Sequence, residues 1–98
     1  MDPKIWGPKL WFSLHTITFN YPNNPTYLDK RFYHDFFTNL KHVIPCSVCK
    51  NHYSQHLENY PISPNLDNKE LLIRWLVNLH NLVNKSLGKR TYSHQEVM

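Results

Sequence analysis

The chain has 98 residues, and its content of 41% hydrophobic and 14% aromatic residues excludes an intrinsically disordered protein. This length suits one domain, so we expect residues 1–98 to form a single unit with a modest hydrophobic core. Eleven Lys and Arg against seven Asp and Glu give a net charge of +4, which favours an anionic partner but does not choose between nucleic acid and a phosphorylated cofactor.

The first predicted element is a helix near the N-terminus. After Pro8, apolar residues keep helical spacing to about Phe19, and the segment YPNNP then ends the helix. A second helix starts after Thr26, a suitable N-cap, and ends near Ile44, because the residue before Pro45 is pushed out of helical geometry. We expect its apolar row to face the core, and that row consists of Leu28, Phe32, Phe36, Leu40 and Val43.

The third predicted helix carries both cysteines of the chain. Pro45 suits its first turn, where a missing N–H costs nothing, and the helix runs to about Asn59. Cys46 and Cys49 then lie in the first turn, where unpaired N–H groups and the helix dipole stabilise a thiolate. Cys46 is the better placed of the two as a nucleophile.

The fourth predicted helix begins with Asp67 and Glu70, which have the spacing of a capping box, and runs to Leu87. Gly88 closes it, and residues 93–96 suit the start of one further turn. No stretch alternates apolar and polar residues for long enough to predict a strand. We therefore predict an all-α fold, an up-and-down four-helix bundle.

Polar residues interrupt the buried face of two of these helices. The row that starts at Leu72 becomes polar at His80 and Asn84 without leaving that face, and His15 follows Trp11 by one turn. A buried imidazole or amide without a partner costs on the order of 1–3 kcal/mol. These residues are either satisfied within the core or face a flat, polar-edged aromatic ligand between the helices.

Neither a signal peptide nor a membrane span is expected. No window approaches the roughly 18 apolar residues of a span, so we expect a cytoplasmic protein. One close cysteine pair in such a chain favours redox chemistry or metal binding over a structural cross-link, with two buried thiols as a further alternative.

Zinc is one reading of the segment CSVCKNHYSQH. On a single helix Cys46 and His56 would lie roughly 15 Å apart, so Cys46, Cys49, His52 and His56 cannot all bind one ion. A small helical zinc- or nucleic-acid-binding module without enzymatic activity remains the alternative function, although the lysines are spread along the chain. The other reading is a redox-active dithiol that exchanges with a substrate dithiol.

Three segments, WGPKLWFSLHT, IPCSVC and HNLVNKSLGK, together resemble the FAD-linked sulfhydryl oxidases of the Erv/ALR type, especially the small members encoded by large DNA viruses. The resemblance covers nearly the whole chain, in the family's order. It implies a four-helix bundle with a short fifth helix, FAD bound non-covalently among the helices, and a symmetric homodimer through the first two helices. For a viral protein the location would be the cytoplasm of the infected cell or the virion.

The resemblance also implies site residues. Those expected to bind FAD are Gly7, Pro8, Trp11, His15, His80, Asn81, Val83, Asn84, Lys85, Leu87, Lys89 and Tyr92. Among them Trp11 and His15 would pack on the flavin nucleotide, Lys85 and Lys89 would contact phosphates, and Tyr92 would lie at the adenine edge. No metal is expected.

The implied reaction is the oxidation of protein dithiols to disulfides. A dithiol of a substrate protein or of a thioredoxin-like redox partner attacks the Cys46–Cys49 disulfide at Cys46. Cys49 then passes two electrons to FAD. Dioxygen then takes the electrons and leaves as hydrogen peroxide. This sequence lacks the second disulfide and the distal shuttle cysteines of many relatives, so stability would rest more on cofactor and dimer contacts.

Overall fold

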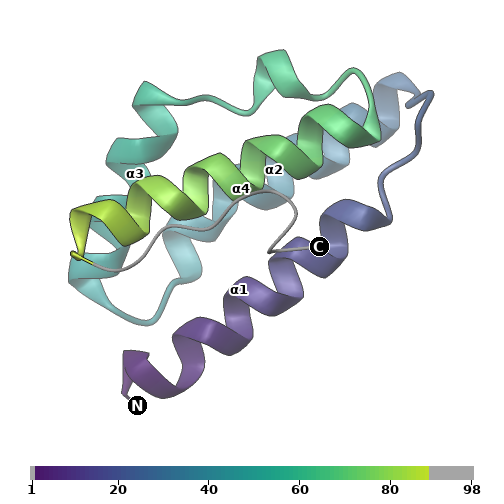
Figure 1. The fold of residues 1–98 in the computed structure, drawn as a ribbon. Helices are drawn as coiled ribbons and strands as arrows, with labels where there is room; N and C mark the ends of the chain where they lie inside the picture. Colours follow the sequence, from purple (N-terminus) through teal and green to yellow (C-terminus); the bar gives the residue numbers. More distant parts are fainter. Residues whose placement is uncertain (1, 89–98) are drawn as a thin grey trace.

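The computed structural model describes residues 2–88 as a bundle of four helices (Figure 1). The helices are α1 (Pro3–Phe19), α2 (Tyr27–Val43), α3 (Ser47–Asn59) and α4 (Lys69–Ser86), and a short 3-10 helix, η1 (Ser63–Asn65), precedes α4. No strand occurs within these residues, so the all-α class and the four helices are confirmed. The turn expected over 93–96 lies outside the described residues. Within residues 2–88, no helix combines the length and apolar character needed to cross a bilayer.

Helix α1 begins at Pro3, so the prediction that it starts after Pro8 is wrong. Asp2 caps it, with a side-chain oxygen that accepts a hydrogen bond from the Lys4 N–H at 2.9 Å, and Pro3 occupies the first turn. The two residues together form a stronger start signal than the one we used. Pro8 is accommodated inside the helix, and it leaves the carbonyl of Lys4 without its usual N–H donor.

Helix α2 has the predicted ends. Thr26 and Asp29 form a capping box, with hydrogen bonds of 3.1 and 2.9 Å between each side chain and the other residue's N–H. Ile44 is the C-cap, as the following proline requires.

The predicted core face of α2 is wrong for most of its members. Of the five residues in that row only Leu40 is buried, and Leu28, Phe32, Phe36 and Val43 are exposed. Phe37 fills the core instead, one residue out of the expected row, and its ring meets Trp75 of α4 edge-on at 5.5 Å.

Helix α3 begins at Ser47, whereas the prediction placed Pro45 and both cysteines in its first turn. Pro45 lies outside the helix, and Cys46 is its N-cap with an extended backbone. The prediction that both cysteines lie inside the first turn is therefore right for Cys49 only. Cys46 supplies a side-chain acceptor, its Sγ, at the position that Ser or Asp usually occupies.

Helix α4 is capped by Asn68, so the capping box predicted from Asp67 is wrong. The Asn68 side chain accepts a hydrogen bond from the Leu71 N–H at 2.9 Å. Asp67 instead forms an ion pair with Lys30 of α2 at 3.1 Å. The helix ends at Ser86, and Gly88 closes it with a φ of 71°, a left-handed conformation that favours glycine.

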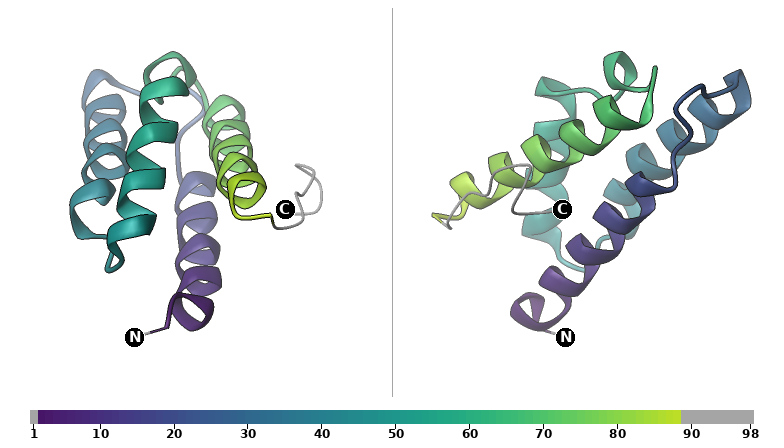
Figure 2. Two further views of the ribbon diagram at one scale, coloured as in Figure 1. Left: turned by 90° about the vertical axis from the view of Figure 1, so that its left-hand side faces the viewer. Right: turned by 45° about the vertical axis from the view of Figure 1, so that its right-hand side comes forward.

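Helix α4 is the centre of the bundle. It packs against α1 and α3, and α3 packs against α2 (Figures 1 and 2). The completely buried side chains are Trp75, Tyr21, Phe37, Leu72, Leu76, Leu79 and Thr18. Each large apolar side chain buried in this way stabilises the fold by roughly 1.5–3 kcal/mol. Four of the seven, Leu72, Trp75, Leu76 and Leu79, belong to α4, in agreement with the apolar face predicted for this helix.

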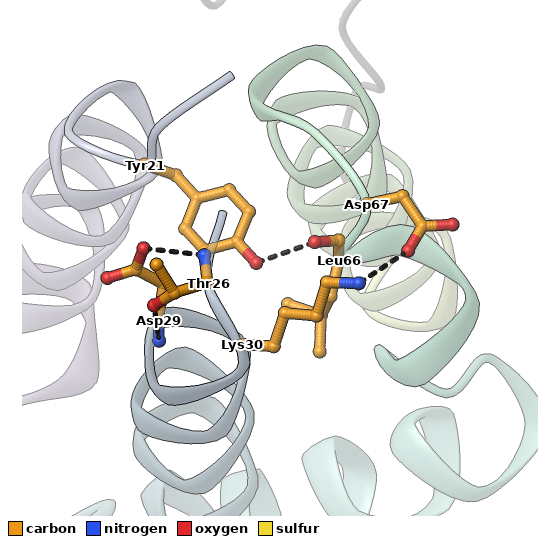
Figure 3. A network of polar contacts seen from close by, with 6 residues as sticks. All are labelled: Tyr21, Thr26, Asp29, Lys30, Leu66 and Asp67. Atoms are coloured by element: carbon orange, nitrogen blue, oxygen red, sulfur yellow. Dashed lines mark hydrogen bonds and ion pairs between the residues drawn. The ribbon is translucent and has the colours of Figure 1, made fainter. Parts of the chain in front are cut away.

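One end of the bundle is fastened by a polar network (Figure 3). The buried Tyr21 hydroxyl donates a hydrogen bond of 2.6 Å to the Leu66 carbonyl, and Lys30 reaches Asp67 beside it. These contacts join the segment after α1 and the start of α2 to the segment before α4. Burial, with the charges of Asp29 and Asp67, raises the pKa of Tyr21 to about 12. We call this region, made of Tyr21, Thr26, Asp29, Lys30, Leu66 and Asp67, the closed end.

Candidate active site

Cys46 and Cys49 form a disulfide at the start of α3, with their Cα atoms 5.2 Å apart. Both residues are half-buried. The Cys49 N–H donates a hydrogen bond to the Cys46 Sγ at 3.3 Å. This donor and the N-terminal dipole of α3 both stabilise negative charge on the Cys46 sulfur, which is the charge that develops when the disulfide is reduced.

A cleft of about 660 Å³ opens beside this disulfide. Its walls come from α1, the C-terminal end of α2, the first half of α3 and the second half of α4. Cys49 belongs to the wall and Cys46 does not. The volume lies in the range of sites that bind drug-sized ligands and cofactors.

Rings and imidazoles from α1 and α4 meet in the cleft. The Trp11 ring stacks on the His80 ring, with centroids 3.9 Å apart and planes 6° apart. His15 Nε2 lies 2.9 Å from His80 Nδ1, so one imidazole donates a hydrogen bond and the other accepts it. His15 is only 7% exposed, and its burial lowers its pKa to about 4, so it is neutral near pH 7. The two histidines therefore satisfy each other, as the first alternative requires, and they also line the cleft, where the second alternative would place a ligand.

Asn84 is a buried polar residue in the cleft whose side chain has no hydrogen-bond partner among residues 2–88. The residue is 6% exposed and lines the cleft one turn beyond His80. Within residues 2–88 its side-chain carboxamide makes no hydrogen bond. Burying an amide in that state costs about 1–3 kcal/mol unless a ligand or water supplies the missing bond. A planar cofactor with polar edges fits both this amide and the aromatic walls.

The sequence model of the Erv1 / Alr family matches residues 8–98. This chain belongs to the Erv1 / Alr family. The resemblance inferred from the three motifs is therefore confirmed.

Relatives within the Erv1 / Alr family include viral and cellular proteins. The "Probable FAD-linked sulfhydryl oxidase R368" of Acanthamoeba polyphaga mimivirus is 36% identical over 100% of this chain and 69% of its own length. The FAD-linked sulfhydryl oxidase of African swine fever virus (isolate Pig/Kenya/KEN-50/1950) is 32% identical over 93% of this chain and 75% of its own. The FAD-linked sulfhydryl oxidase ERV1 of Arabidopsis thaliana is 33% identical over 93% of this chain, which spans 47% of the plant protein.

The fold agrees with solved structures of the same family. The FAD-binding domain of Erv1 from Saccharomyces cerevisiae superimposes with a TM-score of 0.89 at 29% sequence identity. That match covers 99% of this chain and 90% of the yeast domain. A second structure, the yeast Erv1 core, has the same TM-score at 28% identity, over 99% of this chain and 80% of its own.

The structure brings most of the predicted site residues of this Erv1 / Alr chain together. Those that line the cleft are Gly7, Pro8, Trp11, His15, Cys49, His80, Val83, Asn84 and Leu87. Asn81 and Lys85 lie on α4 outside the lining, and Lys85 is exposed in its last turn. Lys89 and Tyr92 lie outside the described residues.

Several lining residues were missed by the sequence reasoning. They are Pro3, Trp6, Leu10, Phe12, Leu14, Leu40, Ile44, Val48 and Tyr53, together with His52, which we had not included in the site. A helix started at Pro3 would have added Trp6 to the row of Leu10 and Leu14, because the three residues are spaced by four. No local signal marks Leu40 or Tyr53, because they reach the cleft through packing between helices.

A metal centre has no candidate in the described part of the chain. Among residues 2–88 no three His, Cys, Asp or Glu side chains lie close enough to share an ion. His56 has a lowered pKa, because of its burial and because of the nearby His52, and neither imidazole is near enough to both cysteines to form the zinc site considered above.

Proposed function

We propose that this chain is an FAD-linked sulfhydryl oxidase in which the Cys46–Cys49 disulfide oxidises protein dithiols. The observation that carries the proposal is the position of this disulfide: Cys49 lines the cleft and Cys46 lies beside it. The names of the relatives agree with the enzyme class and with FAD as the cofactor, as expected from the sequence.

The first step is thiol–disulfide exchange at Cys46. A substrate thiolate attacks the Cys46 Sγ, a mixed disulfide forms, and the Cys46–Cys49 bond breaks so that Cys49 leaves with the electron pair. The second substrate thiolate then attacks the substrate sulfur of the mixed disulfide and releases Cys46. The N-cap position supports this assignment, because the released Cys46 sulfur keeps the Cys49 N–H as a donor.

The reduced pair is left with Cys49 on the cleft wall. When bound in the cleft, FAD supplies an acceptor for this electron pair and a route for it to dioxygen, which becomes hydrogen peroxide. The sum is balanced: one dithiol and one dioxygen give one disulfide and one hydrogen peroxide.

The cofactor would be held mainly by α1 and α4. Trp11 and His80 offer an aromatic stack, and Asn84 offers a carboxamide that has no partner among the described residues. His52, one turn beyond Cys49 and also on the wall, is placed to influence the thiolate. Lys85 and Lys89 remain our proposed phosphate contacts and Tyr92 our proposed adenine contact, and Lys85 also complements the C-terminal dipole of α4. Asn81 remains a proposed contact on the ribose side.

The active form would be a homodimer through α1 and α2. Leu28, Phe32 and Phe36, spaced four residues apart, form a row along one face of α2 and are 55%, 62% and 41% exposed. Phe12 of α1 is 74% exposed. Apolar side chains that gather in this way on a soluble protein are typical of a subunit interface. Sedimentation of the wild type and of Phe32→Glu tests this, with a dimer expected for the first and a shift toward monomer for the second.

The substrates would be protein dithiols or a thioredoxin-like redox partner in the cytoplasm. Both remain proposals, as do the single-domain organisation of residues 1–98 and the absence of a nucleic-acid partner. The viral relatives support a setting inside an infected cell.

Two measurements on the purified protein test the function. We expect flavin absorbance near about 450 nm and oxygen uptake that depends on added dithiothreitol, with hydrogen peroxide formed in equal amount. A colourless protein that binds no added FAD, or a yellow protein that consumes no oxygen with any dithiol, would contradict the proposal.

A further inference from the structure

A second cavity lies on the hairpin formed by α2 and α3. Its volume is about 580 Å³, and it shares no lining residue with the cleft. The lining residues are His34, Thr38, Lys41, His42, Lys50, Asn51, Ser54, Leu57, Glu58, Pro61, Ile62 and Ser63. We call it the α2–α3 groove. Figure 2 shows the two helices side by side.

One end of the α2–α3 groove lies next to the proposed redox centre. Lys41 belongs to the last turn of α2, five residues before Cys46. Lys50 belongs to the start of α3, and its backbone N–H donates a hydrogen bond of 2.9 Å to the Cys46 carbonyl. From Lys50 to Glu58 the groove follows α3 for about 12 Å, the length of three or four extended residues. A peptide in this groove would therefore run toward the disulfide.

The end near the disulfide is positively charged. Lys41 and Lys50 line it beside His42, and among the described residues of the lining Glu58 is the acidic one, two turns away along α3. The ion pairs within residues 2–88 involve Lys30, Arg31, His34 and Arg74 as the basic partners. Lys41 and Lys50 therefore have no carboxylate partner in the described part of the chain.

Helix stability explains only part of this charge. Lys41 and His42 complement the C-terminal dipole of α2. Lys50 is the fourth residue of α3, where the dipole disfavours a cation, and the first turn of α3 contains no acidic residue to offset it. The helix dipole therefore explains Lys41 and His42 but does not explain Lys50.

We propose that the α2–α3 groove docks the protein substrate by an acidic segment beside its dithiol. This inference rests on the proposed function. The ammonium groups of Lys41 and Lys50 would pair with Asp or Glu side chains of the substrate. Thr38, Asn51 and Ser54 supply groups that can hydrogen-bond an extended peptide backbone, and the half-buried Leu57 gives the groove an apolar contact. Because these contacts hold the flanking segment and not the reacting sulfurs, they are equally strong before and during the exchange, so they lower KM and leave kcat unchanged.

The test uses dithiol peptides that share one Cys-x-x-Cys core and carry three Glu, three Gln or three Lys on the same side. Oxygen uptake by the holoenzyme gives kcat/KM for each. We expect the Glu peptide to exceed the Gln peptide by about 5–10-fold at low salt, with most of this preference lost at about 0.5 M salt. In Lys41→Gln/Lys50→Gln the ratio falls to about one, and in Lys41→Glu/Lys50→Glu the Lys peptide becomes the better substrate.

A matched control separates local charge from net charge. Lys9 of α1 and Lys69 of α4 line neither cavity, so Lys9→Gln/Lys69→Gln removes two positive charges without touching the groove. It should retain the full preference for the Glu peptide. Flavin absorbance and far-UV circular dichroism of each variant report whether it is folded and loaded.

Two results would overturn the docking proposal. One is an equal kcat/KM for the Glu and Gln peptides in the wild type. The other is a Lys41→Gln/Lys50→Gln variant that slows dithiothreitol and all three peptides by the same factor, since the lysines would then act on the disulfide and not on the substrate. Failure of the oxidase function is distinguishable, because it would abolish oxygen uptake with dithiothreitol. Fluorescence anisotropy of a labelled Glu peptide with Ser in place of Cys measures peptide binding to the groove independently of turnover.

Discussion

The two ends of this bundle treat their buried polar groups differently. At the closed end, the Tyr21 hydroxyl has an acceptor, the Leu66 carbonyl, and Lys30 has Asp67 (Figure 3). At the cleft end, the Asn84 carboxamide is buried without a partner in the described residues, and the cleft beside it has a volume of about 660 Å³. Within residues 2–88 the closed end satisfies its buried polar groups, whereas the cleft end leaves a buried carboxamide that a ligand could bond.

This contrast separates what stabilises the fold from what serves the chemistry. A small domain has little stability to spare, so an unpaired buried amide is tolerated where bound cofactor offsets its cost. Changes at the closed end should therefore lower stability with or without FAD. Changes at the cleft end should act through the cofactor or the reaction, and the predictions below use this difference.

The largest effect is expected for Cys49→Ser. The variant should keep its flavin absorbance and fold, because Ser is smaller than Cys and the cleft retains its other walls. Dithiol-dependent oxygen uptake should fall by about 1,000-fold or more, because no sulfur then remains on the cleft wall to carry the electron pair. Ser13→Ala, at an exposed position on α1, is the control and should retain full turnover. Normal turnover in Cys49→Ser would contradict the assigned role.

Asn84→Leu should separate cofactor binding from stability. The FAD-free protein should be as stable as the wild type or up to about 1 kcal/mol more stable, because the substitution removes an unpaired buried amide. FAD should bind at least about tenfold more weakly, a loss of about 1.4 kcal/mol. Fluorescence titration with FAD and urea unfolding measure the two quantities. Asn78→Leu is the control, because Asn78 is exposed on the same helix and bonds the Tyr60 hydroxyl. An FAD affinity of Asn78→Leu that differs from the wild type, or an FAD affinity of Asn84→Leu that equals it, would contradict this account.

The helix ends show which parts of the fold can be predicted from sequence. Thr26 and Gly88 were placed correctly, because a cap or a left-handed glycine depends on residues within one turn. The start of α1 was misplaced because Pro8 resembles a helix boundary, although Asp2 and Pro3 are a better one. Competing local signals of this kind differ by only about 1–3 kcal/mol, which tertiary packing overrides.

The candidate site was predictable where a residue conflicts with its neighbours. His15, His80 and Asn84 stand out as polar residues on apolar faces, and all three line the cleft. Tyr53 has no such conflict and reaches the cleft only through packing. The exposed row on α2 shows the opposite limit: Phe32 and its neighbours have the spacing of a core face, and spacing is the same whether the covering surface is the chain's own core or a second subunit.

Tyr21→Phe should weaken the closed end without affecting the cofactor. The substitution leaves the Leu66 carbonyl buried without its donor, and we expect a loss of about 1–3 kcal/mol in the free energy of unfolding. For a domain of this size the melting temperature would fall by about 4–8 °C per kcal/mol. FAD affinity should not change. Tyr27→Phe, at a residue that is 75% exposed, should change neither quantity. A weakened FAD affinity in Tyr21→Phe would show that the two ends are coupled.

The dependence of stability on pH should also differ between the ends, with a slope of at most about 1.4 kcal/mol per pH unit for each group. Burial lowers the pKa of His15 to about 4. Between pH 6.5 and 4 the unfolded chain therefore binds a proton that the folded chain does not bind, and stability falls as the pH falls. Burial raises the pKa of Tyr21 to about 12, so between pH 10 and 12 the unfolded chain loses a proton that the folded chain keeps, and stability falls as the pH rises.

Urea unfolding of the FAD-free protein across this range gives both slopes. His15→Gln should flatten the acid slope and leave the alkaline one, and Tyr21→Phe should do the reverse, each incompletely. His56, whose pKa is lowered by burial and by His52, adds to the acid slope. Tyr53, whose pKa is raised by burial, adds to the alkaline one. If either substitution altered both slopes equally, proton binding at the cleft end and at the closed end would not be independent, and the separation of the two ends would be wrong.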